Sequence, residues 1–190
     1  VRWLSFFGSI IENMLLTFLQ PNKWRFTSVV AHMDSSGFQA IPIIILLNFM
    51  VGAVIAFLGA TVLEQFGATI FTVHLVGFAF MREFGVLLTA ILIAGRTASA
   101  FAAHIGSMRL NEEVDALKVS GVDPLNMLVL PRVTALLVSL PLLTFIAIVA
   151  GILGGMVVSV FMLGISPTLF VDVLIDKVGL RHFLVGMYKA

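Results

Sequence analysis

The residues of this chain most able to do chemistry are two adjacent charges, Arg82 and Glu83, set in an otherwise apolar stretch. Such a pair can form an ion pair, bind a charged ligand or relay protons. Each charge at the centre of a membrane helix costs about 2.5–3.5 kcal/mol on insertion scales, so intramembrane charges are functional candidates by default. The alternative that stays open is a structural ion pair whose arginine reaches outward to lipid phosphates.

The composition is that of a membrane protein. Of the 190 residues, 60% are hydrophobic and 11% are charged, whereas soluble chains have about 45–50% and 25%. The mean hydropathy is +1.13. A net charge of +1 gives no sign of a nucleic-acid partner.

Catalytic and metal-binding patterns are missing from the sequence. Without cysteine there is neither a disulfide nor a thiolate site, and the four histidines lack ligand spacing. No phosphate-binding loop or nucleophile elbow is present. We therefore expect no metal, no cofactor and no enzymatic activity in this chain. Energy for any transport would come from a partner.

Apolar blocks predict an all-α polytopic fold in a single domain, 1–190. A spanning helix needs about 20 apolar residues, and the sequence offers about three to four such segments. The motif "GISP" predicts a turn after the third. The first residues pair aromatic with charged side chains, which is typical of an interfacial helix, here ended by Pro21. The predicted order is an interfacial elbow helix at 1–26, spans at 35–63, 66–108 and 133–160, a cytoplasmic loop at 109–132, a periplasmic segment at 164–178 and the start of a fourth span at 179–190.

Basic residues predict the orientation. Those that flank the spans cluster before the first span and between the second and third, which places both regions in the cytoplasm; they are Arg2, Lys23, Arg25, Arg109, Lys118 and Arg132. The block at 66–108 must then cross once, so the charged pair lies within a membrane helix. A re-entrant half-helix at 66–80 is the alternative.

The depth of the pair follows from helix geometry. Arg82 lies 14 residues before Arg96, or about 21 Å along a helix. Adjacent side chains point about 100° apart, since a turn has 3.6 residues. Arg82 and Glu83 therefore cannot both face lipid, and at least one must face protein or a water-filled cavity.

Small residues recur at every fourth position, which lets helix backbones approach closely in lipid. We interpret these ladders as packing seams within a bundle or dimer, although alanine and glycine are common in membrane helices anyway. The ladders are Gly52–Ala56–Ala60, Ala94–Ala98–Ala102–Gly106 and Ala147–Gly151–Gly155.

The cytoplasmic loop predicts a short amphipathic helix. Asn111 is the expected N-cap, acidic residues suit the first turn, and Gly121 suits the C-terminal stop. Asp123 and Pro124 would start the next helix. A helix this short is marginal alone, so its apolar face favours docking to a cytosolic partner over an ordinary solvated turn.

The stretch "REFGVLLTAILIAGRTASAFAAHIGSMRLNEEVDALKVSGVDPLNMLVLPR", from Arg82 to Arg132, resembles the core signature of the MlaE/YrbE permeases. These are membrane subunits of ABC transporters that move phospholipids across the bacterial envelope. The resemblance continues through "SLPLLT" at 139–144. It implies a homodimeric, multi-pass permease of the bacterial inner membrane with five spans per subunit. The sequence would cover the elbow and roughly the first three spans, as a fragment.

The same resemblance implies partners and site residues. It implies an MlaF-like ATPase, which would bind the ATP, an MlaD-like MCE protein and an MlaB-like STAS protein. Arg82 and Glu83 match the family's pair beside the lipid cavity, and Ile55, Val62, Leu63 and Phe66 are expected, from position alone, to line that cavity. The helix at 111–121 would be the coupling helix, with Glu112, Glu113, Asp115, Leu117 and Gly121 facing the ATPase.

The sequence departs from the family pattern at three positions. His104 stands where an acidic residue is usual, Ala98 replaces a frequent glycine and Val86 a frequent proline. Two other functions stay open. One is a secondary transporter or channel that uses Arg82 and Glu83 as a proton or ion relay. The other is a scaffold subunit that carries nothing.

Overall fold

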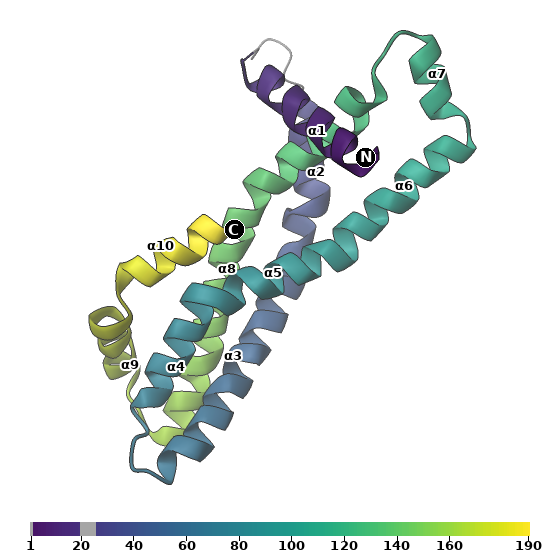
Figure 1. Cartoon of the computed structure of the whole chain (residues 1–190). Coiled ribbons are helices and arrows are strands. Elements are labelled where there is room, and N and C mark those ends of the chain that lie inside the picture. Colours follow the sequence, from purple (N-terminus) through teal and green to yellow (C-terminus); the bar gives the residue numbers. More distant parts are fainter. Residues whose placement is uncertain (1, 20–25) are drawn as a thin grey trace. The chain divides into compact units, whose positions relative to one another are not determined.

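The computed structural model describes residues 2–19 and 26–190, and this part of the chain is helical without strands (Figure 1). The all-α prediction is confirmed. The α-helices are α1 (Arg2–Leu19), α2 (Phe26–Ser36), α3 (Ile41–Glu64), α4 (Phe71–Ala79), α5 (Gly85–Ile93), α6 (Ser99–Leu110), α7 (Glu113–Val119), α8 (Leu130–Leu163), α9 (Pro167–Val173) and α10 (Gly179–Lys189). Between them lie a 3₁₀ turn, η2 (Phe38–Ala40), and the π-helical segments η3 (Phe80–Phe84), η4 (Ala94–Ala98), η5 (Leu125–Val129) and η6 (Leu174–Val178).

Three continuous helical segments in the described chain are long and apolar enough to cross a membrane. They run from Phe26 to Glu64, from Phe71 to Leu110 and from Leu125 to Leu163. The protein is therefore a multi-pass membrane protein. The first and third segments extend beyond the spans predicted at 35–63 and 133–160, whereas the second begins five residues later than the predicted 66–108 and ends two residues later. The second segment stays helical from end to end, as a single crossing requires, and it carries Arg82 and Glu83.

The chain forms two compact units. One comprises Val1–Gln39 and Arg96–Ser139, and the other comprises Ala40–Gly95 and Leu140–Ala190. Long helices run through both, so α8 contributes its first ten residues to one unit and the remainder to the other. The candidate lipid site and the loop predicted to couple to an ATPase fall in different units.

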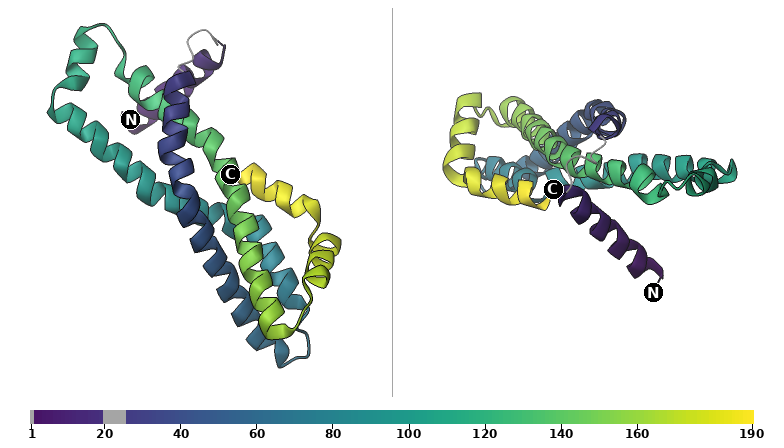
Figure 2. Two further views of the ribbon diagram at one scale, coloured as in Figure 1. Left: turned by 180° about the vertical axis from the view of Figure 1, so that it is seen from behind. Right: turned by 90° about the horizontal axis from the view of Figure 1, so that it is seen from above.

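In the second unit, α3, α4 and the later part of α8 lie side by side (Figures 1 and 2). Gly52 and Gly151 bring α3 and α8 together, because a Cβ on Gly52 would overlap the Gly151 carbonyl. Gly154 packs in the same way against the Phe49 carbonyl. Contact this close maximises dispersion between helices that gain little hydrophobic energy in lipid.

Two of the three small-residue ladders are confirmed as packing seams. Ala56, Ala60 and Ala147 are fully buried. The third ladder is exposed along its whole length, from Ala94 to Gly106, and α6 buries none of its residues. Within this chain, the third ladder has no packing partner among the described residues.

Two buried polar side chains of this unit bond to the backbone of their own helix. The amide of Asn48 donates to the Ile44 carbonyl at 2.8 Å, and the hydroxyl of Thr89 donates to the Gly85 carbonyl at 2.7 Å. Each bond reaches back four residues, so the donor is satisfied without a partner helix.

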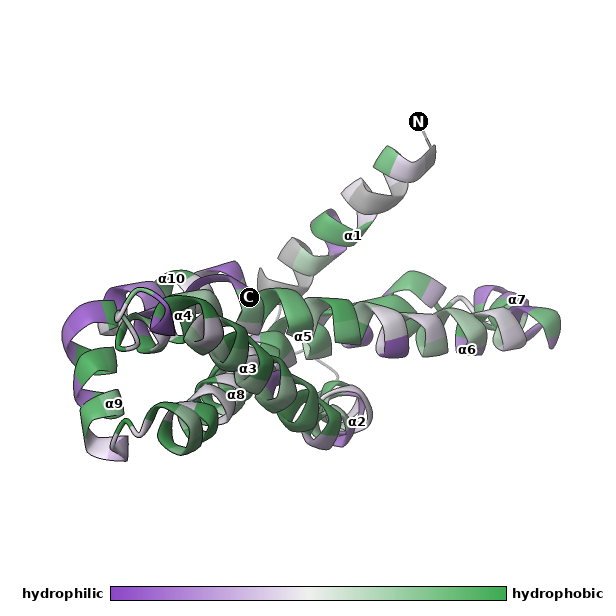
Figure 3. Ribbon diagram, turned by 90° about the horizontal axis from the view of Figure 1, so that it is seen from below, coloured by the Kyte–Doolittle hydropathy of each residue, from purple (hydrophilic) through white to green (hydrophobic). Residues whose placement is uncertain are grey.

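The turn predicted after the third span is confirmed. Gly164 adopts a φ of 65°, and the Ser166 hydroxyl accepts from the Leu169 N–H at 3.3 Å at the start of α9. The following residues, predicted as a periplasmic segment, are helical, and Phe170 is buried against Val73. Hydrophilic residues are frequent around α9 and α10 and on α7, whereas α3 and α8 are largely hydrophobic (Figure 3).

The segments predicted at the two ends of the sequence are both helical. The predicted elbow is α1, whose Trp3 and Leu4 are each 78% exposed; the stop at Pro21 lies outside the described residues. The predicted start of a fourth span corresponds to α10. This helix has 11 residues and is amphipathic. The membrane positions of both helices stay predictions.

Candidate functional site

Arg82 and Glu83 lie on the π-helical segment η3. There the Gly85 N–H donates to the Phe80 carbonyl, one residue further back than in an α-helix. Such a bulge inserts one residue into a helical turn and is frequent at functional sites. Here it points Phe80 into the core, fully buried, while the side chains of Arg82 and Glu83 stay 54% and 57% exposed.

A third charge, Lys189 of α10, joins the pair. Its ammonium donates to the Glu83 carboxylate at 2.7 Å and to the Arg82 carbonyl at 3.3 Å. The Arg82 Nε contacts the same carboxylate oxygen at 3.3 Å. We call these three residues the charged triad. Sequence reasoning missed Lys189, because 106 residues separate it from Glu83 and no motif marks it.

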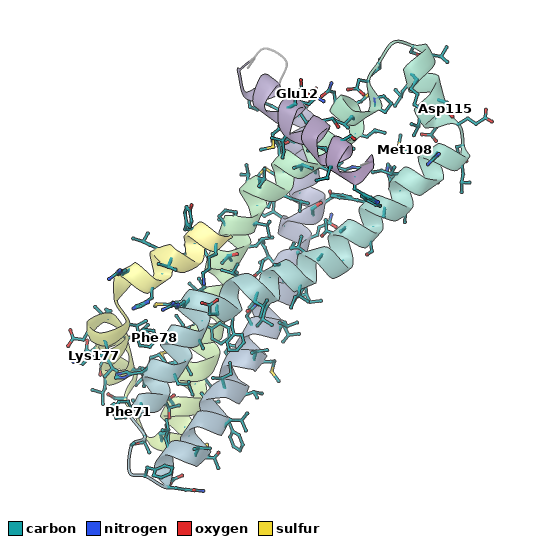
Figure 4. All side chains as sticks on the ribbon, viewed as in Figure 1. Glu12, Phe71, Phe78, Met108, Asp115 and Lys177 are labelled. Carbon is teal, nitrogen blue, oxygen red and sulfur yellow. The ribbon has the colours of Figure 1, made fainter. Side chains whose placement is uncertain are left out.

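Close packing of α10 against η3 holds the triad together. A Cβ on Gly186 would overlap the Met81 carbonyl, so glycine is needed for this approach. Edge-to-face ring contacts support it, with centroids 4.7 Å apart for Phe78–His182 and 5.9 Å apart for Phe145–Phe183. Figure 4 shows Phe78 on the side of α4 nearest α10.

The four apolar residues predicted to line a cavity differ in their surroundings. Ile55 packs against the cluster of Ala56, Val76 and Phe80, as Phe84 does, so it lies close to η3. The others lie nearer the end of α3 and in the turn beyond it; Val62 is 57% exposed, Leu63 is half-buried and Phe66 is 77% exposed. Their role in binding stays a prediction.

The start of the predicted coupling helix requires a correction. The N-cap of α7 is Glu112, with a φ of 60°, whereas Asn111, the predicted N-cap, is the C-cap of α6. The Asn111 amide donates to the Glu113 carboxylate at 3.4 Å rather than capping a backbone N–H. The reason is that α6 continues to Leu110 and reverses within two residues, which forces Glu112 into the left-handed region.

The end of α7 is as predicted. Gly121 has a φ of 75°, and its N–H donates to the Lys118 carbonyl at 3.0 Å. The Val122 N–H donates to the Leu117 carbonyl at 3.0 Å. This pair of bonds is a Schellman motif, which requires a left-handed residue and so favours glycine. Asp123 then caps the next turn, since its carboxylate accepts from the Leu125 N–H at 3.1 Å.

The polar face of α7 is open to solvent. Asp115 and Lys118 form an ion pair at 2.7 Å, and Figure 4 places Asp115 on the short helix at the far end of the loop. The hydrogen bond from Lys118, together with its charge, lowers the pKa of Asp115. Glu112 and Glu113 are exposed, whereas Val114 and Leu117 are half-buried. The arrangement presents acidic groups outward, as a docking helix would, and that role stays a prediction.

No cluster of three or more histidine, cysteine, aspartate or glutamate side chains in residues 2–19 and 26–190 could hold a metal ion.

A family model described as Permease MlaE matches residues 29–190. The chain is 36% identical over 167 residues to the "Intermembrane phospholipid transport system permease protein MlaE" of Haemophilus influenzae, a match that covers 87% of this chain and 64% of that protein. It is 37% identical over 145 residues to a "Probable ABC transporter permease protein" of Synechocystis, covering 76% and 55%.

A more distant relative is a plant protein, "Protein TRIGALACTOSYLDIACYLGLYCEROL 1, chloroplastic" of Arabidopsis thaliana. It is 28% identical over 170 residues, which cover 90% of this chain and 49% of that protein. The chain thus spans about half to two thirds of the length of these three relatives.

Proposed function

This chain belongs to the MlaE permease family, and from that premise we propose that it is the permease subunit of an ABC transporter that moves phospholipids between the inner and outer bacterial membranes. It would carry no enzymatic activity and would lie in the inner membrane. The Haemophilus relative's name supports the phospholipid substrate, and the Synechocystis relative's name supports the transporter class.

The charged triad is the observation that carries the proposal. Its Arg82 and Glu83 lie on a helical segment apolar enough to span a membrane, Lys189 reaches them from α10, and all three side chains are at least 39% exposed in the single chain. Charges at membrane depth avoid lipid tails and face protein or a water-filled cavity. An exposed triad therefore needs a polar cavity, and the boundary of a second subunit is a place where one can form.

The charge of the triad suits a phospholipid headgroup. Two cations and one carboxylate leave one net positive charge, which favours the phosphate that every phospholipid carries. Apolar side chains on the part of α3 that packs near η3, Ile55 among them, would meet the acyl chains. An amphiphile thus finds both kinds of partner around η3.

The assembly follows from what this chain lacks. Its sequence has no nucleotide-binding motif, so we assign ATP hydrolysis to an MlaF-like subunit that docks on α7. An MlaD-like MCE protein and an MlaB-like STAS protein would complete the complex. A second copy of the chain would make the permease a homodimer, and the exposed small-residue ladder from Ala94 to Gly106 offers a surface for such a contact.

Charge exchange within the triad tests the proposal. The Glu83→Lys variant gathers three cations, and we expect it to reduce ATP-driven lipid transfer in reconstituted vesicles at least about tenfold. The double variant Glu83→Lys with Lys189→Glu restores one carboxylate between two cations and should recover most of the transfer. Lys177→Glu, a lysine reversal on η6 outside the triad, is the matched control and should leave transfer unchanged.

The outcomes separate the functions. Normal transfer by the Glu83→Lys variant would refute a role of the triad in transport. Transfer that follows a proton gradient without ATP would instead establish the secondary transporter. A complex that assembles but transfers no lipid with any variant, wild type included, would indicate a scaffold.

A further inference from the structure

A second polar cluster lies in the unit formed by Val1–Gln39 and Arg96–Ser139. The Arg132 guanidinium of α8 donates from Nη2 to the His104 Nδ1 of α6 at 2.8 Å. The same guanidinium lies over the Phe101 ring at 4.8 Å, and His32 of α2 contacts that ring edge-on at 5.9 Å. Side chains from three helices therefore meet at the Phe101 ring.

We propose that Arg132 and His104 are positioning residues that hold α6 and α8 together, and that protonation of His104 separates the two helices. Since α6 leads into the loop that contains α7 and α8 leads out of it, we call these two helices the stems of the loop, and the Arg132–His104 contact the clamp. The proposal rests on the proposed function, because it takes α7 to be where the ATPase acts. His104 lies in the middle of α6 and Arg132 in the first turn of α8, so residues 105–131, including the whole of α7, lie between them along the chain.

Arg132 depends on this contact to an unusual degree. The residue is 6% exposed, and its Nε and Nη1 atoms have no hydrogen-bond partner. No ion pair within the described part of the chain includes Arg132. Leaving a buried charge without its partner is strongly destabilising, so loss of the His104 bond removes the principal polar stabilisation of this guanidinium.

The chemistry of the pair fixes the state of His104. A guanidinium can only donate, so Nδ1 must accept, and the imidazole must be neutral with its proton on Nε2. Protonation would remove the acceptor and set two cations 2.8 Å apart. Among the described residues, the charged or titratable groups that interact with His104 are Arg132 from α8 and His32 from α2, and neither supplies a negative charge to offset this repulsion. His104 is exposed in the single chain and lies six residues before the end of the second long segment at Leu110, where protons from the cytoplasmic side would reach it.

The consequence is mechanical. With the stems joined, a displacement of α7 moves α6 and α8 as one body. With the stems apart, the same displacement is absorbed by separation of the two helices. Acid strong enough to protonate this imidazole against the Arg132 cation should therefore weaken the coupling between ATP hydrolysis and lipid transfer.

The distance between the two stems can be measured directly. The sequence contains no cysteine, so introduced cysteines can be labelled specifically. Spin labels on cysteines replacing Ala103 of α6 and Val138 of α8 report their separation in the reconstituted complex, with labelled chains diluted into unlabelled ones. In the wild type we expect one short distance at pH 8 and a longer, broader distribution at pH 5.5. Lipid transferred per ATP hydrolysed should fall over the same interval by about tenfold, a value corresponding to 1.4 kcal/mol.

Two variants make the test decisive. His104→Gln keeps an uncharged acceptor, so the short distance and the coupling should persist at both pH values. His104→Lys is a permanent cation, so the stems should be apart and the coupling lost at both, while ATP hydrolysis continues. A wild-type response to pH that survives in His104→Gln would overturn the proposal, as would a closed, coupled His104→Lys variant. Failure of the proposed function would look different, since even the wild type at pH 8 would then transfer no lipid on ATP hydrolysis.

Discussion

The backbone contact between α3 and α8 predicts that a glycine-to-alanine substitution at Gly52 lowers the thermal stability of the protein, whereas the same substitution at Gly8, outside this contact, does not. Gly52 is buried, and a Cβ placed there would overlap the carbonyl of Gly151. Backbone atoms on two long helices cannot turn aside as a flexible side chain can, so Gly52→Ala must push the helices apart. A gap of about 0.5–1 Å already loses a quarter to a half of the dispersion energy between facing atoms.

The size of the effect follows from this overlap. Overpacking costs about 1–3 kcal/mol, and we expect Gly52→Ala to lie near the upper end, at about 2–3 kcal/mol, because the obstacle is backbone. In a chain of this length that corresponds to a midpoint lower by about 4–12 °C. The assay is thermal unfolding of the detergent-solubilised protein at one scan rate, because membrane proteins often unfold irreversibly.

Gly8 of α1 is the matched control, since nothing lies within 4 Å of a Cβ built there. Alanine has a higher helix propensity than glycine by about 0.8–1.0 kcal/mol, so Gly8→Ala should leave the midpoint unchanged or raise it. If Gly52→Ala behaved as Gly8→Ala does, then α3 and α8 would not approach through Gly52, and the packing described for this unit would be wrong.

Three further predictions concern single interactions. Gly121→Ala places a Cβ in the left-handed region at a cost of about 1–2 kcal/mol, so the amides of α7 should exchange with solvent roughly 5- to 30-fold faster; unchanged exchange would contradict the Schellman end. Thr144→Val replaces a fully buried hydroxyl that has no hydrogen-bond partner and should stabilise the protein by about 1 kcal/mol. Thr89→Val instead loses a hydrogen bond of 2.7 Å to the Gly85 carbonyl and should not stabilise it. Equal thermal midpoints for the two variants would contradict the difference in hydrogen bonding between these hydroxyls. The lowered pKa of Asp115 means that its ion pair stabilises α7 at neutral pH and that this is lost as the pH falls through the lowered value. Protection of α7, corrected for intrinsic exchange, should therefore drop about twofold in acid, and Lys118→Met should abolish that drop.

Sequence reasoning predicted the features that depend on local pattern. Apolar runs identified the three helical segments, and the motif around Gly121 predicted how α7 ends, because a left-handed residue is needed there whatever surrounds it. It placed the N-cap of α7 one residue early, at Asn111, since the capping preference of asparagine was outweighed by the continuation of α6 to Leu110. The π-helical segment under Arg82 and Glu83 was not foreseen, because a single inserted residue leaves the apolar pattern unchanged.

What the sequence determined by itself is the class of the protein, since apolar composition and uncharged runs of sufficient length dictate membrane helices before any contact forms. It also marked Arg82 and Glu83, because a charge is costly at membrane depth in any fold. Only the tertiary structure decided that Lys189 completes the first cluster and that Arg132 is buried against His104. Both are contacts between residues far apart in the chain, and such contacts depend on how closely two helix backbones can pack, which no local pattern of residues encodes.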